Sequence, residues 1–141
     1  MSVLIVATRL RLSGPHHRTK FLRAAAAAIR QSTTTSGNLG TEVLPEADDV
    51  YWTRTAWIDR DSMLAFVTAE PHFGMMGSLD EWCDEASFVE WEQSTPRFPE
   101  WSSVFDRLVR DGRSPTLSRP SSDHGVRSFP PPSATWAGRD R

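Results

Sequence analysis

The sequence predicts an α+β domain of the ferredoxin-like type, with a four-stranded antiparallel sheet and both of its helices on one face. Two observations predict this fold class. Segments of β-branched or alternating residues come in turn with segments of helical periodicity, in the order β-α-β-β-α-β. In addition, 141 residues with 38% hydrophobic content suit one domain with a tail.

The first half of the chain is expected to form a strand, a helix and a hairpin. Val3–Leu12 is rich in branched residues and then alternates, which is typical of a strand. Phe21–Gln31 is rich in alanine, the strongest helix former, and follows a Gly-Pro break. Asn38–Leu44 and Val50–Ile58 alternate on either side of a turn and are predicted to form a hairpin.

The second half is expected to add a helix and a fourth strand. Asp59 is a favourable N-cap for a helix with an apolar stripe, and Pro71 interrupts that helix. A short helical turn is expected at His72–Gly77, followed by helical or irregular acidic chain at Leu79–Glu85. The fourth strand is predicted at Ala86–Ser94, where apolar and polar residues alternate again.

Three regions are predicted along the chain. Residues 1–95 form the ferredoxin-like domain, residues 96–112 an appended helix, and residues 113–141 a tail. The appended helix is expected at Trp101–Asp111, where large apolar residues recur at helical spacing. The tail contains five prolines and many serines, which favours an extended or disordered chain.

The third strand is expected to present different side chains to the two faces of the sheet. Trp52 and Arg54 share one face, whereas Thr55 and Trp57 share the other. The two helices of this fold cover only one face, so the other face would be left bare. We therefore predict a homodimer in which two sheets face each other.

The charged residues predict ion pairs and a solvated surface. Arg9 and Arg11 are expected to pair with Glu90 and Glu92 across the sheet. The acidic residues of segment 80–85 lack the glycine and the spacing of a calcium-binding loop, and we interpret them as a solvated face. The sequence therefore predicts no metal site.

Composition excludes several classes of protein. The formal net charge of −2 gives no case for binding nucleic acid, whose phosphates require a basic patch. The apolar run at the N-terminus stops at Thr8 and is too short for a signal peptide or a membrane span. The single cysteine, Cys83, excludes an internal disulfide and fits a reducing compartment. We expect a cytoplasmic protein.

Three segments carry a resemblance to a known superfamily: TRTAWIDRDSMLAFV at 53–67, EPHFGMM at 70–76 and WCDEASFVEW at 82–91. In this order they resemble the dimeric α+β barrel superfamily, which includes the antibiotic-biosynthesis monooxygenase-like proteins and a spheroidene monooxygenase-like group. The resemblance covers roughly residues 3–94. The superfamily includes cofactor-free oxygenases, haem-dependent enzymes, isomerases, cyclases and simple binders, so the resemblance implies a fold more narrowly than an activity.

With this resemblance, His72 is the foremost candidate for a functional residue. It could serve as an acid/base group or ligate a haem iron, and the alternative is a histidine satisfied by a backbone carbonyl. Arg54 would stabilise an anionic oxygen of the substrate. The predicted walls of the site are apolar side chains: Trp52, Trp57, Trp91, Phe66 and Met76.

The tryptophans have a second interpretation, which is packing in the core or at the dimer interface. If the helices cover the Trp57 face, then Trp57 and His72 belong to one site and Trp52 belongs to the dimer contact. If the helices cover the other face, these roles exchange.

The sequence thus predicts a small-molecule enzyme of the antibiotic-biosynthesis monooxygenase-like class. It would oxidise a hydrophobic aromatic or polyene metabolite in specialised metabolism, without a cofactor. Such an enzyme needs a base and an oxyanion partner, and His72 and Arg54 are predicted to supply them. The alternatives are a haem-dependent enzyme with a histidine ligand, an isomerase or cyclase on the same scaffold, and a non-catalytic binding module.

Overall fold

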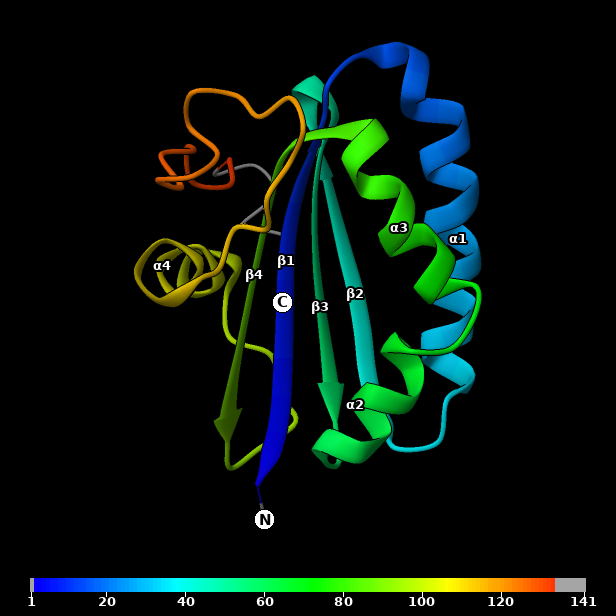
Figure 1. Ribbon diagram of the computed structural model, residues 1–141. Helices are drawn as coiled ribbons and strands as arrows, with labels where there is room; N and C mark the ends of the chain where they lie inside the picture. The colour runs from blue at the N-terminus through cyan, green and yellow to red at the C-terminus, as the bar shows by residue number, and fades with distance from the viewer. Residues whose placement is uncertain (1, 134–141) are drawn as a thin grey trace.

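The computed structural model describes residues 2–133 and contains a four-stranded antiparallel sheet in the order β2-β3-β1-β4 (Figure 1). The predicted α+β class and its β-α-β-β-α-β order are confirmed. The strands and helices follow one another as β1 (Val3–Leu12), α1 (Arg18–Thr34), β2 (Asn38–Glu46), β3 (Val50–Trp57), α2 (Arg60–Val67), α3 (His72–Trp82), β4 (Cys83–Gln93) and α4 (Trp101–Asp111).

Most predicted elements are present, and the local signals act as expected. The side chain of Asp59 accepts a hydrogen bond from the Ser62 amide at 2.8 Å, which makes Asp59 the N-cap of α2. Helix α1 (Arg18–Thr34) is longer than predicted at both ends, and at its C-terminal end the polar residues beyond Gln31 continue the helix. Their hydroxyls bond to backbone carbonyls one turn earlier, as Thr34 does to Arg30 at 3.1 Å.

The segment between α2 and β4 was predicted in part. The helical turn expected at His72–Gly77 is present, and of the two possibilities for Leu79–Glu85 the helical one holds as far as Trp82, where α3 ends. Leu79 and Trp82 lie three residues apart, on one side of the helix, and both are buried. Strand β4 therefore begins at Cys83, three residues earlier than predicted, and includes the acidic residues Asp84 and Glu85.

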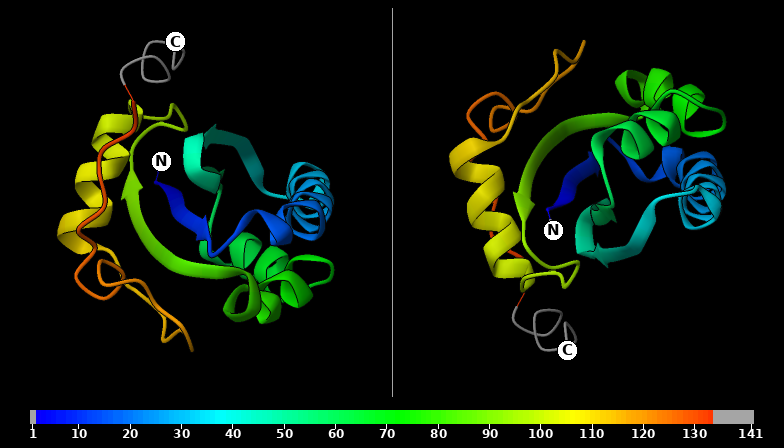
Figure 2. Two further views of the ribbon diagram at one scale, coloured as in Figure 1. Left: turned by 90° about the horizontal axis from the view of Figure 1, so that it is seen from above. Right: turned by 90° about the horizontal axis from the view of Figure 1, so that it is seen from below.

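The helices form a layer on each side of the sheet (Figure 2). Helices α1, α2 and α3 cover one face, and α4 covers the opposite face. The sequence predicted a homodimer because this second face would otherwise be bare. Trp101, Val104 and Leu108 of α4 are buried against it, so the bare face on which that prediction rested does not exist in the chain as described.

The buried ion pair of the sheet also differs from the prediction. Arg9 bonds to Glu85 through Nη1 and Oε1 at 2.6 Å, and Arg11 bonds to Asp84 at 2.7 Å, so the predicted partners Glu90 and Glu92 were wrong. The register explains the difference, because Glu90 stands opposite Val6 on the other face of the sheet. Asp84 and Glu85 are consequently ion-paired rather than part of a solvated face.

Residues 113–133 fold back on the domain. The segment contains no helix or strand, and its first residue, Arg113, exchanges two backbone hydrogen bonds with Phe88 of β4 at 2.7 and 2.9 Å. Leu117, His124 and Phe129 are buried, which the prediction of an extended or disordered tail did not include. Residues 134–141 of the predicted tail lie outside the described residues.

We predict that Glu85→Gln destabilises the protein by about 3–5 kcal/mol, because it leaves the charge of Arg9 buried without its partner. Both side chains are less than 5% exposed. Chemical denaturation at neutral pH measures the loss. The matched control is Glu90→Gln, whose partner Arg60 is more than half exposed, and it should cost less than about 1 kcal/mol.

The same pair should make stability depend on pH. Burial acts to raise the pKa of Glu85, but hydrogen bonds from Arg9 and Ser121 and the nearby positive charges outweigh it and hold that pKa below its usual range. The contribution is therefore present above the pKa of an unfolded glutamate, about 4.3, and is lost as pH falls through the folded value. Equal losses of stability in Glu85→Gln and Glu90→Gln would contradict the assignment of Arg9 and Glu85 as a buried ion pair.

Candidate functional site

The two faces of the sheet differ in how completely they are covered. On the α4 face the central strands are fully buried: Val3, Ile5, Ala7, Arg9, Val50, Trp52, Arg54 and Ala56. On the face toward α1–α3 the ends of the same strands are buried, but their middle is only half-buried. Solvent therefore reaches the middle of the sheet on the side that has three helices.

The half-buried residues form one continuous patch, which we call the floor. Across the sheet, Thr55 stands opposite Val6, and Val6 opposite Glu90; one step along, Thr53 stands opposite Thr8, and Thr8 opposite Phe88. The floor comprises Val6, Thr8, Thr53, Thr55, Phe88 and Glu90. Side chains in the middle of a helix-covered sheet are normally buried, so the helices do not close over this patch.

The floor separates two clusters of buried apolar side chains. At one end, Leu4, Trp57, Met63 and Phe66 form a cluster beneath α2. At the other end is a larger cluster around α1 and α3, to which the tail contributes one side chain. Its members are Leu10, Leu12, Phe21, Tyr51, Leu79, Trp82, Cys83, Ala86 and Leu117, the last of them from the tail. On the α4 face, by contrast, one cluster runs the length of the sheet. On the face toward α1–α3, the apolar core is therefore interrupted at the floor, where Thr8, Thr53 and Thr55 lie.

Hydroxyl groups give the floor its polar character. The side chains of Thr8 and Thr53 hydrogen-bond to each other, and Thr55 accepts a bond from the indole nitrogen of Trp57 at 2.8 Å. Glu90 is paired with Arg60 at 2.8 Å, at the outer side of the patch. A hydroxyl can donate and accept, so the floor suits neutral oxygen-bearing groups on an otherwise apolar molecule.

Three aromatic rings extend from one end of the floor to the start of α3. The rings of Trp57 and Phe66 stack with centroids 5.2 Å apart, and those of Phe66 and His72 lie 4.4 Å apart. Val6 of the floor packs against the same cluster. The structure therefore brings together three of the residues that the sequence singled out.

The surroundings of His72 favour the neutral imidazole. Its Nδ1 lies 3.2 Å from the carbonyl oxygen of Val67, which can only accept, so in the neutral ring Nδ1 carries the proton and Nε2 has the lone pair. Burial lowers the pKa of the ring, and the bond to Val67 offsets only part of that effect. A half-buried neutral histidine with an unprotonated Nε2 has the form that a general base requires.

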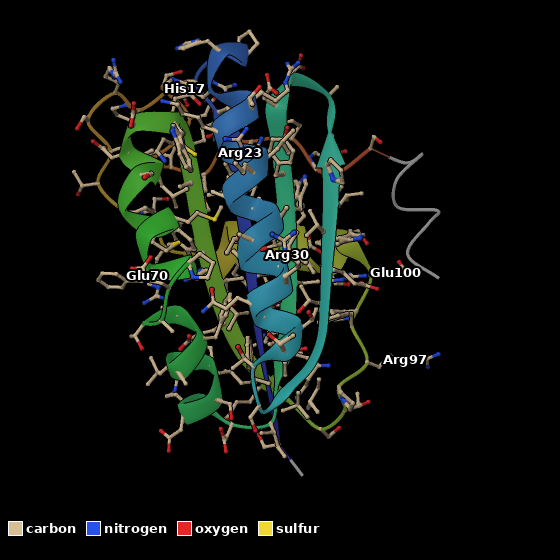
Figure 3. The ribbon with its side chains drawn as sticks, turned by 90° about the vertical axis from the view of Figure 1, so that its right-hand side faces the viewer. His17, Arg23, Arg30, Glu70, Arg97 and Glu100 are labelled. Carbon is tan, nitrogen blue, oxygen red and sulfur yellow. The ribbon has the colours of Figure 1, made fainter. Side chains whose placement is uncertain are left out.

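Gln31 of α1 fixes the position of His72, and the sequence analysis did not single it out. Its Oε1 accepts the His72 backbone N–H at 2.8 Å. Its Nε2 donates to the carbonyls of Phe66 and Ala69 at 3.0 and 3.2 Å. One side chain thereby ties α1 to the end of α2 and the start of α3. Figure 3 shows these helices side by side, with Glu70 in the connection.

Arg54 lies on the opposite face of the sheet from His72, and the structure does not bring the two together. Its guanidinium bonds to Glu42 at 2.5 and 2.7 Å and to the Pro99 carbonyl at 2.5 Å, and its carbon lies 3.9 Å from the Trp101 ring centroid. The side chain is 2% exposed. These contacts attach α4 and its preceding linker to the sheet.

Trp52 and Trp91 also lie on the α4 face. The indole nitrogen of Trp52 donates to Glu46 at 2.7 Å, and the ring of Trp91 packs under the guanidinium of Arg107 at 4.5 Å. Met76 is on the floor side of the sheet but packs against the cluster of Leu79 and Trp82, away from Phe66. Of the predicted wall residues, Phe66 contacts His72 and Trp57 contacts Phe66.

Three further observations concern the described residues. Burial raises the pKa of the Cys83 thiol to about 12, so it stays protonated at neutral pH and is a poor nucleophile. Within residues 2–133 there is no group of three or more His, Cys, Asp or Glu side chains placed to hold a metal ion. No helix in that range is long and apolar enough to cross a membrane.

A sheet of this order, with α1–α3 over one face, defines a small α+β domain of the ferredoxin-like type. The family model described as "Antibiotic biosynthesis monooxygenase" matches residues 4–76, just over half of the chain. The chain belongs to this family, which confirms that part of the resemblance seen in the sequence. A search of the curated proteins found no match.

Solved structures share the fold at low sequence identity. A putative antibiotic biosynthesis monooxygenase from Nitrosomonas europaea is 15% identical with a TM-score of 0.59, over 67% of this chain and 92% of its own. A variant of SnoaB, a cofactor-independent oxygenase from Streptomyces nogalater, is 13% identical with a TM-score of 0.53, over 68% of this chain and 95% of its own. A conserved protein from Methanosarcina mazei is 16% identical with a TM-score of 0.58, over 64% and 92%.

We predict that NMR titration of the His72 ring gives a pKa below the ordinary value of about 6.5. In Gln31→Ala the segment from Phe66 to His72 loses three hydrogen bonds, so the ring should become more hydrated and its pKa should rise toward the ordinary value. Thr33→Ala, on the exposed side of α1, is the control and should leave the titration unchanged. A His72 pKa at or above 6.5 in the unaltered protein would contradict the assigned environment.

Proposed function

We propose that this protein is a small-molecule enzyme that oxidises a hydrophobic aromatic or polyene metabolite bound over the floor, without a cofactor. The single observation that carries the proposal is the floor itself. A patch of six half-buried side chains lies in the middle of a sheet face that three helices otherwise cover. Membership of the antibiotic biosynthesis monooxygenase family supports an oxidation as the reaction.

The chemistry of the surroundings supports the substrate class. The floor is flanked by a stack of aromatic rings at one end and by apolar side chains at the other. Its polar groups are hydroxyls, and its one carboxylate, Glu90, is already paired with Arg60. A flat apolar molecule with a few phenol or carbonyl oxygens would match both features.

In the proposed mechanism, Nε2 of His72 removes a proton from the bound substrate. The resulting carbanion gives an electron to O₂, and the substrate radical and superoxide combine to a peroxide. The protonated peroxide loses water to leave a new C=O group, so the substrate supplies all the electrons and no cofactor is consumed. The sequence analysis assigned oxyanion stabilisation to Arg54, but Arg54 lies on the other face of the sheet. The threonine hydroxyls of the floor are the groups placed to donate to a substrate oxygen.

This proposal draws support from the fold neighbours as well. SnoaB is a cofactor-independent oxygenase, and its sheet and helices superpose on most of this chain. At 13% identity this likeness extends to the fold alone. A cytoplasmic location, a role in specialised metabolism and the spheroidene monooxygenase-like resemblance stay predictions from the sequence.

We predict that His72→Ala lowers turnover at least about 100-fold, the usual loss when a general base is removed, while the protein stays folded. Oxygen uptake with a panel of hydroxylated polycyclic aromatic compounds and polyenes measures turnover, and circular dichroism checks the fold. The control is His16→Ala, because His16 is exposed in the turn before α1.

The dependence on pH provides a second readout of the same role. A base must be neutral to act, so the rate should fall as pH drops through the lowered pKa of His72. Unchanged oxygen uptake by a folded His72→Ala variant would remove His72 from the mechanism.

A further inference from the structure

A cavity of about 240 Å³ lies at one end of the sheet, on the face opposite the floor. It is situated between the turn that joins β2 to β3 and the tail. The strands and the turn contribute Arg9, Glu46, Ala47, Asp48 and Val50, and the tail contributes Pro130, Pro131 and Ser133. The volume exceeds that of a water molecule, about 30 Å³, and falls below the range for drug-sized ligands, about 300–1,000 Å³. The cavity therefore has room for a small metabolite.

Arg9 is the positive group of this cavity. The residue is 3% exposed, and its guanidinium carbon lies 4.2 Å from the ring centroid of Phe129 in the tail. Its Nη1 donates to Glu85 at 2.6 Å, whereas its Nε has no hydrogen-bond partner among the described residues. Burial lowers the pKa of Arg9 in spite of the bond to Glu85. Buried donors normally have partners, so the guanidinium has capacity left for an acceptor in the cavity.

Glu46 is a negative group of the same cavity, and two neutral donors hold it in place. The indole nitrogen of Trp52 donates to Oε1 and the Ser133 amide donates to Oε2, each at 2.7 Å. These bonds orient the carboxylate without neutralising it, and within residues 2–133 no ion pair involves Glu46. Asp48, which is exposed, adds a second carboxylate to the lining. The cavity therefore presents one buried cation and two carboxylates.

The charges around the cavity favour a ligand that carries both signs. The neighbouring ion pairs of Arg9 with Glu85 and of Arg11 with Asp84 already balance each other. A simple anion would meet the two carboxylates of the lining, and a simple cation would meet the buried guanidinium, so each would be opposed by like charge. A molecule with a negative and a positive group at its two ends satisfies both parts of the cavity.

We propose that the cavity binds a small zwitterion, an α-amino acid with a short apolar side chain such as L-valine. Its carboxylate accepts hydrogen bonds from Arg9, and its ammonium group donates to Glu46 and Asp48. Its side chain lies against Val50 and Pro130, because the remaining lining consists of alanine, valine and proline. This site goes beyond the proposed function and does not depend on it, since the floor lies on the other face of the sheet.

The ligand would also join the tail to the sheet, because its contacts come from both. A ligand that binds the folded chain and not the unfolded one raises the melting temperature as its concentration rises. We therefore expect L-valine to raise the melting temperature of the full chain in proportion to the occupancy of the cavity.

Two-dimensional NMR during titration of the full chain with L-valine tests the site directly. The indole N–H of Trp52 bonds to Glu46, and Val50 lines the cavity, so both signals report on its occupancy. Both should shift and saturate, while the methyl signals of Val6 on the floor stay in place. Acetate and methylammonium, which carry one charge each, should leave them unchanged at the same concentration. Absence of saturable shifts with L-valine, or equal shifts with either single ion, would overturn the proposal.

Charge-removing variants assign the binding to this cavity. Glu46→Gln keeps an oxygen that can accept from Trp52 but loses the charge, and it should raise the dissociation constant for L-valine at least about tenfold. Asp48→Asn should also weaken binding, and asparagine adopts the positive φ of 65° at this position, so this variant keeps the test decisive if Glu46→Gln does not fold. Glu81→Gln, exposed on α3, is the control and should bind as before. Unchanged affinity in a folded Glu46→Gln protein would overturn the proposal.

Discussion

The alternation of side chains along the two central strands is the constraint on which the rest of the structure depends. Each step along β1 or β3 moves a side chain to the other face, so neighbouring residues take part in different layers. Thr53 and Thr55 face α1–α3, whereas Trp52 and Arg54 face α4. A slip of one residue would exchange the floor for the core beneath α4.

This constraint explains why the two sides of the sheet can serve different purposes. On the α4 side, large side chains and cation–aromatic contacts fill the middle of the face, and a cavity remains beside Arg9, Val50 and Pro130. The ion pair between Arg9 and Glu85 is buried on this side. On the other side, short hydroxyl-bearing residues leave the middle of the sheet accessible. Stability comes from the first arrangement, and the room for a ligand comes from the second.

Much of the fold could be predicted because it depends on local patterns. The strand in Val3–Leu12, the N-cap at Asp59 and the helix Trp101–Asp111 each have a signal within a few residues. The end of α3 could not be predicted in this way, because Leu79 and Trp82 are helical by packing and lie in an acidic stretch. The partners of Arg9 and Arg11 depend on the register of β4 against β1, which no local pattern specifies.

The candidate site was predictable in part. Trp57, Phe66 and His72 are conspicuous residue types in one stretch of chain, and the structure places Phe66 between the other two rings. Gln31 and Thr8 could not be found, because each acts through partners about 40 residues away in sequence. Arg54 was misleading, since an arginine between two tryptophans suggests a site, but its face of the strand packs against α4.

The central claim is that a hydrophobic ligand binds over the floor and not against the opposite face. Methyl NMR during titration with a hydroxylated polycyclic aromatic compound tests it, because neighbouring residues of β1 report on different faces. The account predicts that the methyl signals of Val6 and Thr8 shift while those of Ile5 and Ala7 stay in place. Shifts confined to Ile5 and Ala7 would contradict it.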